Sequence, residues 1–287
     1  IFESSPIQLT GTPPAQGWVF SFSSCCRNAT ISNIQNSSSY GFSLRAIMYS
    51  VNGQSVSPCF DSSPDFAERP SSATAVGYNF LYTPFATDNE LDSIVYSWDA
   101  PLDSWGGGTW SSTNPPTIPY IAGCNPFPMP ATLNPLTGEI SCVFPVAGVF
   151  NAVNKVSSYK CGVLSAEIYR DMQFAVIATS SNNHPVVTPP FFDSITSQPT
   201  FYDTVYAGDL VTFPINAIDP DFQNVTLEAA GSQFGGGFTD TSSGCLIPPC
   251  ATLNPPPPLT SPIVAATTFQ WQTTNQPKNV PVRQQNA

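Results

Sequence analysis

Proline is the residue that most restricts how this chain can fold. The sequence has 31 prolines in 287 residues, and many of them are adjacent to another proline, including a run of four at residues 255–258. Proline has no amide hydrogen to donate and holds φ near one value, so it breaks a helix when it stands in the interior. The proline distribution therefore excludes long helices over almost the whole chain.

Short alternating segments rich in Val, Ile, Phe, Tyr and Thr lie between the prolines. The clearest are residues 18–23, 42–49, 94–98, 173–178, 210–215 and 268–272. Runs of four to eight such residues, bounded by Gly, Pro, Asn and Ser, are typical of strands joined by tight turns. The sequence predicts an all-β protein built from tandem Ig-like or cadherin-like β-sandwich domains in an elongated, disulfide-containing arrangement.

An internal repeat suggests where the domains lie. Residues 85–98 and residues 216–229 both read as a small residue, an acidic turn and an apolar strand, which indicates the same corner of two related units. We expect a Cys-containing β unit, either separate or sharing a core with the next one, then two sandwiches and a linker or truncated end. The boundaries are 1–75, 76–183 (closed by the strand at 173–179), 184–272 and 273–287.

Charge excludes several function classes. The chain has 8 Lys and Arg against 19 Asp and Glu, a net charge of −11, and only 9% charged residues, where about 25% is usual. Binding to nucleic acid through phosphates requires a basic surface, and so does attraction to an anionic membrane. No apolar run approaches the length of a transmembrane helix. We expect neither nucleic acid as a partner nor membrane insertion.

The cysteines point to an oxidising compartment. An even, scattered set without CxxC pairs, accompanied by the single histidine His184, favours disulfides over a zinc site. Buried free thiols are the alternative. Cys245 and Cys250 form the most favourable pair because they close a small loop. Adjacent cysteines bond with strain, so we expect distant partners for the first two. The eight positions are Cys25, Cys26, Cys59, Cys124, Cys142, Cys161, Cys245 and Cys250.

Two acidic turns are candidate calcium sites. Calcium takes about 6–8 oxygen ligands, often carboxylates at alternate loop positions. The favoured alternative is an Asx-type turn, in which the carboxylate accepts backbone amides. The candidate ligands are Asp88, Glu90 and Asp92 in the first turn and Asp219 and Asp221 in the second.

An aromatic loop is the candidate ligand-binding segment. Trp105 and Trp110 flank three glycines, and such indoles stack on apolar sugar faces; the alternative is that they cap the end of a sandwich. The sequence lacks GxSxG, HExxH, P-loop and GxGxxG motifs. Glycoside hydrolysis needs only two acids, for example Asp99 and Asp103, but nothing selects such a pair. We therefore expect a protein that is not an enzyme.

Several segments resemble known surface proteins. Residues 133–150 resemble the "TG-x-I…PG-x-Y" signature of bacterial cadherin-like and Ig-like repeats, and residues 217–221 resemble their acidic turn, although Asp-Phe-Gln-Asn stands where the repeats have Asp-Gly-Asp. Residues 22–28, 160–173 and 201–209 are similar to the giant SprB-type adhesins of gliding Bacteroidetes, which the type IX secretion system exports. Short motifs spread over most of 18–272 carry this resemblance.

The resemblance implies a location and a modification. It implies an extracellular, cell-surface protein involved in gliding or surface attachment. Bacteroidetes O-glycosylation at Asp-Ser/Thr-aliphatic triplets would place glycans on Ser93, Ser194 and Thr204.

Together these features favour a non-catalytic segment of an extracellular adhesin or filament, with spacer and adhesive β-domains. Its expected partners are other copies or domains of the same surface protein and surface glycans. No cofactor is expected other than calcium. The alternative is a carbohydrate-binding module or an accessory domain of a secreted glycan-active enzyme, with Trp105 and Trp110 as its binding residues.

Overall fold

The computed structural model describes residues 6–54, 61–66, 72–90, 92–104, 115–121, 126–127, 129–178, 183–229, 233–234 and 249–273. Apart from one 3₁₀ turn at Ser37–Ser39, the regular elements in these residues are strands, so the predicted all-β class is confirmed. The search for membrane-spanning helices in the described residues finds none that is long and apolar enough.

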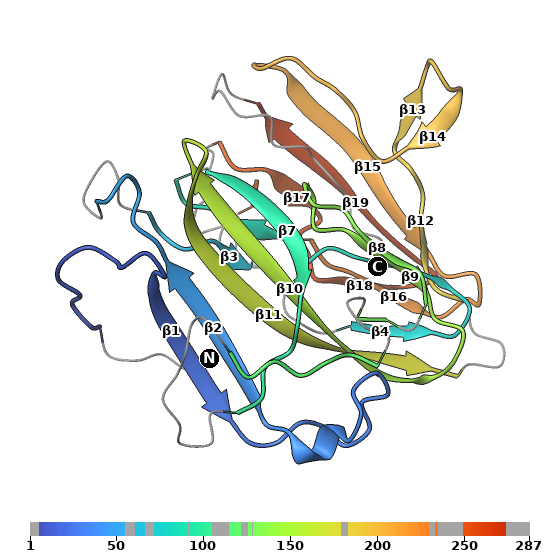
Figure 1. Cartoon of the computed structure of the whole chain (residues 1–287). Coiled ribbons are helices and arrows are strands. Elements are labelled where there is room, and N and C mark those ends of the chain that lie inside the picture. Colours follow the sequence, from blue (N-terminus) through green and yellow to red (C-terminus); the bar gives the residue numbers. More distant parts are fainter. Residues whose placement is uncertain are drawn as a thin grey trace.

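A six-stranded sheet forms the first half of the molecule (Figure 1). Its order is β1 (Trp18–Ser24), β2 (Phe42–Met48), β11 (Val163–Ile177), β10 (Gly148–Lys160) and β7 (Ser93–Asp99), and β4 (Ser72–Ala75) pairs in parallel with β11. Cys161 and Gly162, both with positive φ, make the tight turn of the long β10–β11 hairpin. Strands from residues 1–75 and from residues 76–183 therefore belong to one sheet.

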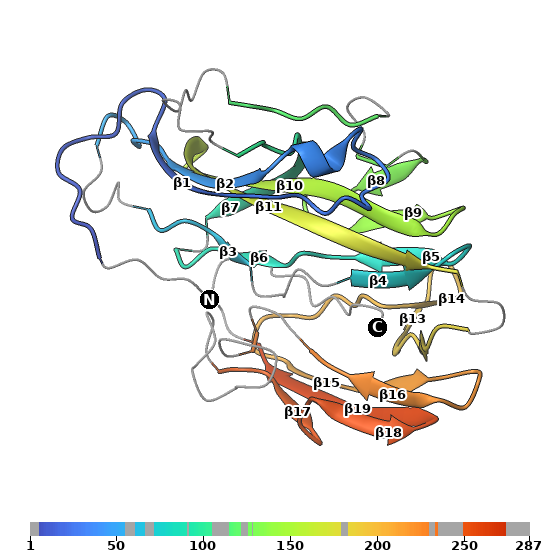
Figure 2. The same cartoon turned by 90° about the horizontal axis from the view of Figure 1, so that it is seen from below.

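A second layer packs on one face of this sheet (Figure 2). It contains the sheet β5 (Asn79–Tyr82), β9 (Ile140–Val143) and β8 (Ala131–Leu133), and the pair β3 (Asp65–Phe66) and β6 (Ala86–Thr87). The core between the layers is aromatic, and its rings meet mostly edge to face, the geometry that ring quadrupoles favour. Its largest members are Phe80, Tyr82, Phe127, Phe144, Phe150 and Phe174.

Loops cover part of the opposite face of the large sheet. Ile31, Ile34, Ile118 and Tyr120 form a small apolar cluster there, packed against Val149 of β10. Strand β10 is consequently buried on both sides, including polar residues such as Asn151 and Ser158. Strand β11 begins at Val163 and not near 173 as predicted, because residues 165–168 are all buried, whereas burial alternates along β11 only over residues 172–177. Strands covered on both faces lose the alternation of apolar and polar residues that sequence analysis relies on.

The second half, from residue 183 to residue 273, has its own strands and core. One sheet has the order β12 (Val186–Val187), β15 (Leu210–Ile218), β19 (Val264–Gln272) and β17 (Thr252–Asn254), accompanied by the pairs β13 (Phe191–Asp193) with β14 (Gln198–Thr200) and β16 (Asn224–Leu227) with β18 (Leu259–Pro262). Figure 2 shows this group below the first half. We call residues 6–178 the first unit and residues 183–273 the second unit.

Asn183 and His184 of the second unit contact Tyr78 of the first unit. The Tyr78 ring packs edge-on against the His184 ring, with centroids 5.1 Å apart. The Asn183 side-chain amide donates to Asp221 Oδ1 at 2.9 Å, and the Asn183 backbone amide donates to Asp221 Oδ2. Residues at the start of the second unit are thus tied to its own acidic turn and to a tyrosine of the first unit.

Candidate functional site

The two acidic turns share one hydrogen bond. Asp88 and Asp219 are both buried, and each accepts a hydrogen bond from the amide four residues later: Asp92 N to Asp88 Oδ1 at 2.9 Å, and Gln223 N to Asp219 Oδ1 at 3.2 Å. Asp219 Oδ1 also accepts the Asp221 amide at 2.8 Å. Carboxylates that accept nearby amides in this way stabilise Asx-type turns. The repeat in the sequence therefore corresponds to a repeated turn.

The first turn brings together charged side chains that are distant in the sequence. Lys160, at the end of β10, places its Nζ 3.3 Å from Asp61 Oδ1 and 3.1 Å from Asp92 Oδ2. One ligand oxygen from each of Asp61, Asp88 and Asp92 lies within 4.8 Å of the others. Among the described residues these three are the one group of three or more Asp, Glu, His or Cys side chains close enough to share a cation. We call them, with Lys160, the Lys160 cluster.

The cluster only partly matches the predicted ligands. Asp88 and Asp92 take part, whereas Glu90 instead accepts hydrogen bonds from the Ser62 amide at 3.2 Å and the Ser62 hydroxyl at 2.8 Å. Sequence analysis missed Asp61, because no local spacing links it to the turn. In the second unit, Asp219 stabilises its own turn and Asp221 binds Asn183. These two are not joined by a third ligand in the part of the chain that the structure describes.

Burial sets the electrostatics of the cluster. Burial raises the pKa of Asp61 to about 6 and also raises the pKa of Asp88, because a carboxylate loses hydration when it leaves water. Burial alone would lower the pKa of Lys160, but its hydrogen bonds to Asp92 and Asp61 outweigh that effect and raise it. The Lys160 ammonium therefore supplies positive charge where a bound cation would otherwise do so.

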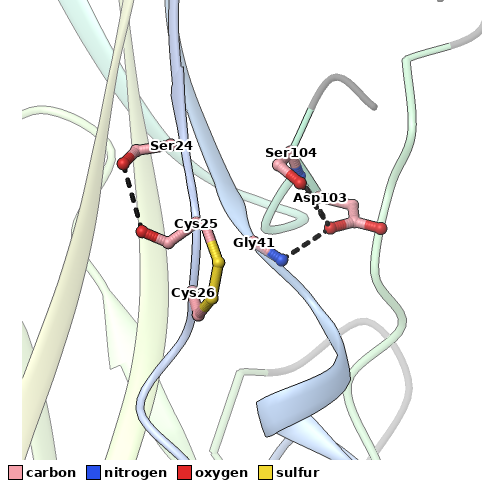
Figure 3. Close-up of a disulfide and its surroundings, with 6 residues drawn as sticks. All are labelled: Ser24, Cys25, Cys26, Gly41, Asp103 and Ser104. Carbon is pink, nitrogen blue, oxygen red and sulfur yellow. Dashed lines mark hydrogen bonds between the residues drawn. A yellow bond between two sulfur atoms is a disulfide. The ribbon is translucent and has the colours of Figure 1, made fainter. Parts of the chain in front are cut away.

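The cysteines differ from the favoured prediction at four positions, although the buried free thiol of Cys142 matches the alternative. Cys25 and Cys26 are bonded to each other and not to distant partners (Figure 3). Cys142 and Cys161 have free thiols. Cys142 lies in the aromatic core, where burial raises its pKa to about 12, and Cys161 occupies the exposed β10–β11 turn. Cys250 is disulfide-bonded. Outside the described residues lie Cys59, Cys124 and Cys245.

The predicted sugar-binding residues Trp105 and Trp110 also lie outside the described residues. The base of their loop is described. Asp103 N donates to Pro116 O at 2.8 Å, and Leu102 forms an isolated bridge with Thr117. Asp103 Oδ1 accepts the Gly41 and Ser104 amides, each at 2.7 Å, near the Cys25–Cys26 pair (Figure 3). These contacts hold the two ends of the loop together.

The two acids considered for glycoside hydrolysis both have other partners. Asp99 pairs with Arg45 at 3.6 Å and accepts the Ala100 amide at 2.7 Å. Asp103 caps the two amides at the base of the loop. Each carboxylate is thus engaged in local structure.

Large apolar side chains protrude from several turns. Ile195, Tyr206, Leu136 and Phe222 are 93%, 85%, 76% and 75% exposed. Single exposed apolar residues are common on soluble proteins, but these four share a setting. Each lies in a turn in which backbone amides donate to an Asp or Asn side chain. We call these four residues the turn-tip residues.

The hydrogen bonds in these turns are short and specific. Asp193 Oδ1 accepts the Ile195 amide at 2.7 Å, and Asn134 Oδ1 accepts the Leu136 amide at 2.9 Å. Asp209 Oδ2 accepts the Tyr206 amide at 3.1 Å, while Phe222 lies between the two amides that donate to Asp219. The pKa of Asp193 is lowered by the hydrogen bond from the Ile195 amide. Sequence analysis missed these residues, although for Ile195, Leu136 and Phe222 an apolar residue two or three positions after Asp or Asn was a visible signal.

The predicted O-glycosylation positions are all exposed. Ser93 begins β7, Ser194 follows Asp193 in the β13–β14 turn, and Thr204 lies in the loop before β15. The Thr204 amide donates to Asp203 Oδ1 at 2.8 Å.

Comparison with known proteins identifies no relative: no protein-family model matches the chain, and no curated protein matches it at a significant level. Inferences about function therefore rest on the residues and their geometry.

Proposed function

We propose that this chain is a non-catalytic structural and adhesive segment of an extracellular surface protein or filament. Its β-sandwich-like units serve as spacers, in the Ig-like or cadherin-like arrangement predicted from the sequence, and its turns supply contacts to other copies of the same protein. Gliding or surface attachment and type IX secretion belong to this proposal through the resemblance of residues 22–28, 160–173 and 201–209 to SprB-type adhesins.

The turn-tip residues are the observation that carries the proposal. An exposed apolar side chain gains free energy when a partner covers it, roughly in proportion to the area removed from water. Ordering a mobile loop on binding would offset part of that gain. In this protein the capping carboxylates and amides already order the turns, so less conformational entropy is lost on association. The low content of charged residues also limits the desolvation cost of a wide contact.

Removing two turn-tip side chains is expected to weaken self-association by about tenfold or more, since interface anchors typically contribute more than about 1 kcal/mol each. The variant is Ile195→Ser with Tyr206→Ser, both in the second unit. The measurement is sedimentation velocity over a concentration series of the full chain. The folded state of the variant is checked by circular dichroism.

The matched control replaces two exposed isoleucines that lie outside such turns. Ile7 is 75% exposed and Ile121 is 63% exposed, so Ile7→Ser with Ile121→Ser removes a comparable apolar area. This control should associate like the wild type. A wild-type chain that stays monomeric at high concentration, or equal losses in both variants, would contradict the proposal.

The alternative function is a carbohydrate-binding module or an accessory domain of a glycan-active enzyme. The supporting observation is the base of the Trp105–Trp110 loop, where the Asp103 amide bonded to the Pro116 carbonyl and the Leu102–Thr117 bridge hold the two ends together. If this alternative is correct, a glycan array binds the wild type and loses that signal with Trp105→Ala. An array without signal for the wild type leaves the adhesive function as the better explanation.

A further inference from the structure

The Lys160 cluster places a primary amine against a buried carboxylic acid. Lys160 Nζ lies 3.3 Å from Asp61 Oδ1, and the two residues are 99 positions apart in the sequence. Their side chains are only 15% and 2% exposed. Asp61 Oδ2 is buried and has no hydrogen-bond partner. A buried oxygen without a partner is costly, and the Asx turns described above leave it unexplained.

We propose that Lys160 and Asp61 condense to form an intramolecular amide bond between Nζ and Cγ. This modification is independent of the adhesive function proposed above. It covalently joins the segment before β3 to the end of β10, and so connects the second layer of the first unit to its large sheet.

The reaction balances without a co-reactant. The Lys160 ammonium first loses one proton, and the neutral amine uses its lone pair to attack Asp61 Cγ. The new C–N bond forms as one C–O bond of Asp61 breaks. The departing oxygen leaves as water with two of the three ammonium protons, and the third stays on the amide nitrogen. The positive and negative charges of the ion pair disappear together.

Asp92 is placed to move the proton. Its Oδ2 lies 3.1 Å from Lys160 Nζ, so it can accept the first proton and later return it to the leaving oxygen, ending as it began. Asp88 is a positioning residue, since it holds the Asp92 amide at 2.9 Å and accepts the Ser158 hydroxyl at 3.0 Å. The raised pKa of Lys160 keeps its amine protonated and makes the step slow.

The first test is the mass of the full chain after reduction, alkylation and denaturation. The wild type is expected to be lighter than its sequence by one water. Trypsin should fail to cut after Lys160, and the digest should contain one branched peptide that joins the Asp61 and Lys160 segments. Lys160→Arg keeps the positive charge but has no amine to react, so its mass should equal that of its sequence.

The control is the other lysine with a carboxylate partner among the described residues. Lys155 Nζ lies 3.1 Å from Glu167 Oε1, so Lys155→Arg removes the amine from a comparable ion pair, and its mass should still be one water below that of its sequence.

In a time course after refolding, Asp88→Asn should slow the appearance of the lighter species at least tenfold without abolishing it. An unchanged rate of formation of the lighter species would show that Asp88 plays no part in the reaction.

A wild-type mass equal to the sequence, with normal cleavage after Lys160, overturns the proposal. If in that case calcium raises the melting temperature of the wild type but not of Asp61→Asn, the cluster is a cation site. Neither result changes the self-association of the turn-tip variants, so failure here is distinguishable from failure of the adhesive function.

Discussion

Asp171→Ala is expected to destabilise the first unit by about 3–5 kcal/mol, the cost of breaking a buried ion pair by removing one partner. Arg27 Nη2 lies 2.6 Å from Asp171 Oδ2, and the side chains are 2% and 10% exposed. The same carboxylate accepts the Asn151 side-chain amide through Oδ1. The Leu102 carbonyl, 2.9 Å from Arg27 Nη2, cannot neutralise the charge that the substitution would leave buried.

Urea unfolding with disulfides intact, followed by far-ultraviolet circular dichroism and calorimetry, measures this loss. The control is Asp99→Ala, because Asp99 is 23% exposed and pairs with Arg45 at 3.6 Å. Its expected cost is smaller than that of Asp171→Ala, because Asp99 is more exposed than Asp171, its ion pair is longer, and the Arg45 guanidinium also lies 4.1 Å from the centre of the Tyr169 ring. Equal costs for the two substitutions would show that burial of the Arg27–Asp171 pair contributes nothing. If Asp171→Ala does not fold, Asp171→Asn, which keeps a hydrogen-bonding group, provides a milder comparison.

Phe174→Ala is expected to cost about 3–5 kcal/mol for a different reason, the cavity left by a large core side chain. Phe174 lies on β11 and is fully buried. Its ring centroid is 5.3 Å from that of Phe80, 5.8 Å from that of Tyr82 and 5.4 Å from that of Phe127. These partners come from the second layer and its connections, so the substitution weakens the contact between the two layers of the first unit.

Differential scanning calorimetry of the full chain tests this prediction, because each unit has its own core. The transition of the first unit should shift to lower temperature while that of the second unit stays in place. Phe192→Ala is the matched control: Phe192 is 65% exposed, and its loss should change stability by about 0.5 kcal/mol or less. Phe174→Leu is the milder variant if alanine prevents folding. A shift no larger than that of Phe192→Ala would contradict the assignment of Phe174 to the core.

The pairing of the cysteines could not be predicted from the sequence. Adjacent Cys25 and Cys26 were expected to have separate partners, yet they bond to each other, and Cys142 and Cys161 are free. Pairing depends on distances through space, which residue spacing does not report. The sequence also does not predict the packing around Cys142 in the aromatic core, because the residues that surround it come from several separate strands.

The acidic turns show both what the sequence determines locally and what it leaves to the tertiary structure. An Asp that accepts nearby amides is a local interaction, so the sequence alone identified Asp88 and Asp219 as turn residues. The arrival of Asp61 and Lys160 at the first turn depends on where the segment before β3 and the end of β10 meet. The hydrogen-bond partner of Asp221 similarly depends on the position of Asn183. Charge partners distant in sequence are decided by tertiary structure.

The all-β class followed from sequence alone, because proline acts on the backbone of its own residue and alternation acts on neighbouring ones. The low charge and the strand–turn–strand repeat could also be recognised from the sequence alone, because they depend on composition and on neighbouring residues. Tertiary structure decided which strands share a sheet, why β11 extends to Val163, which acids meet Lys160, and which apolar residues protrude from ordered turns. These properties depend on packing between segments that are far apart in the chain, and so on the whole fold.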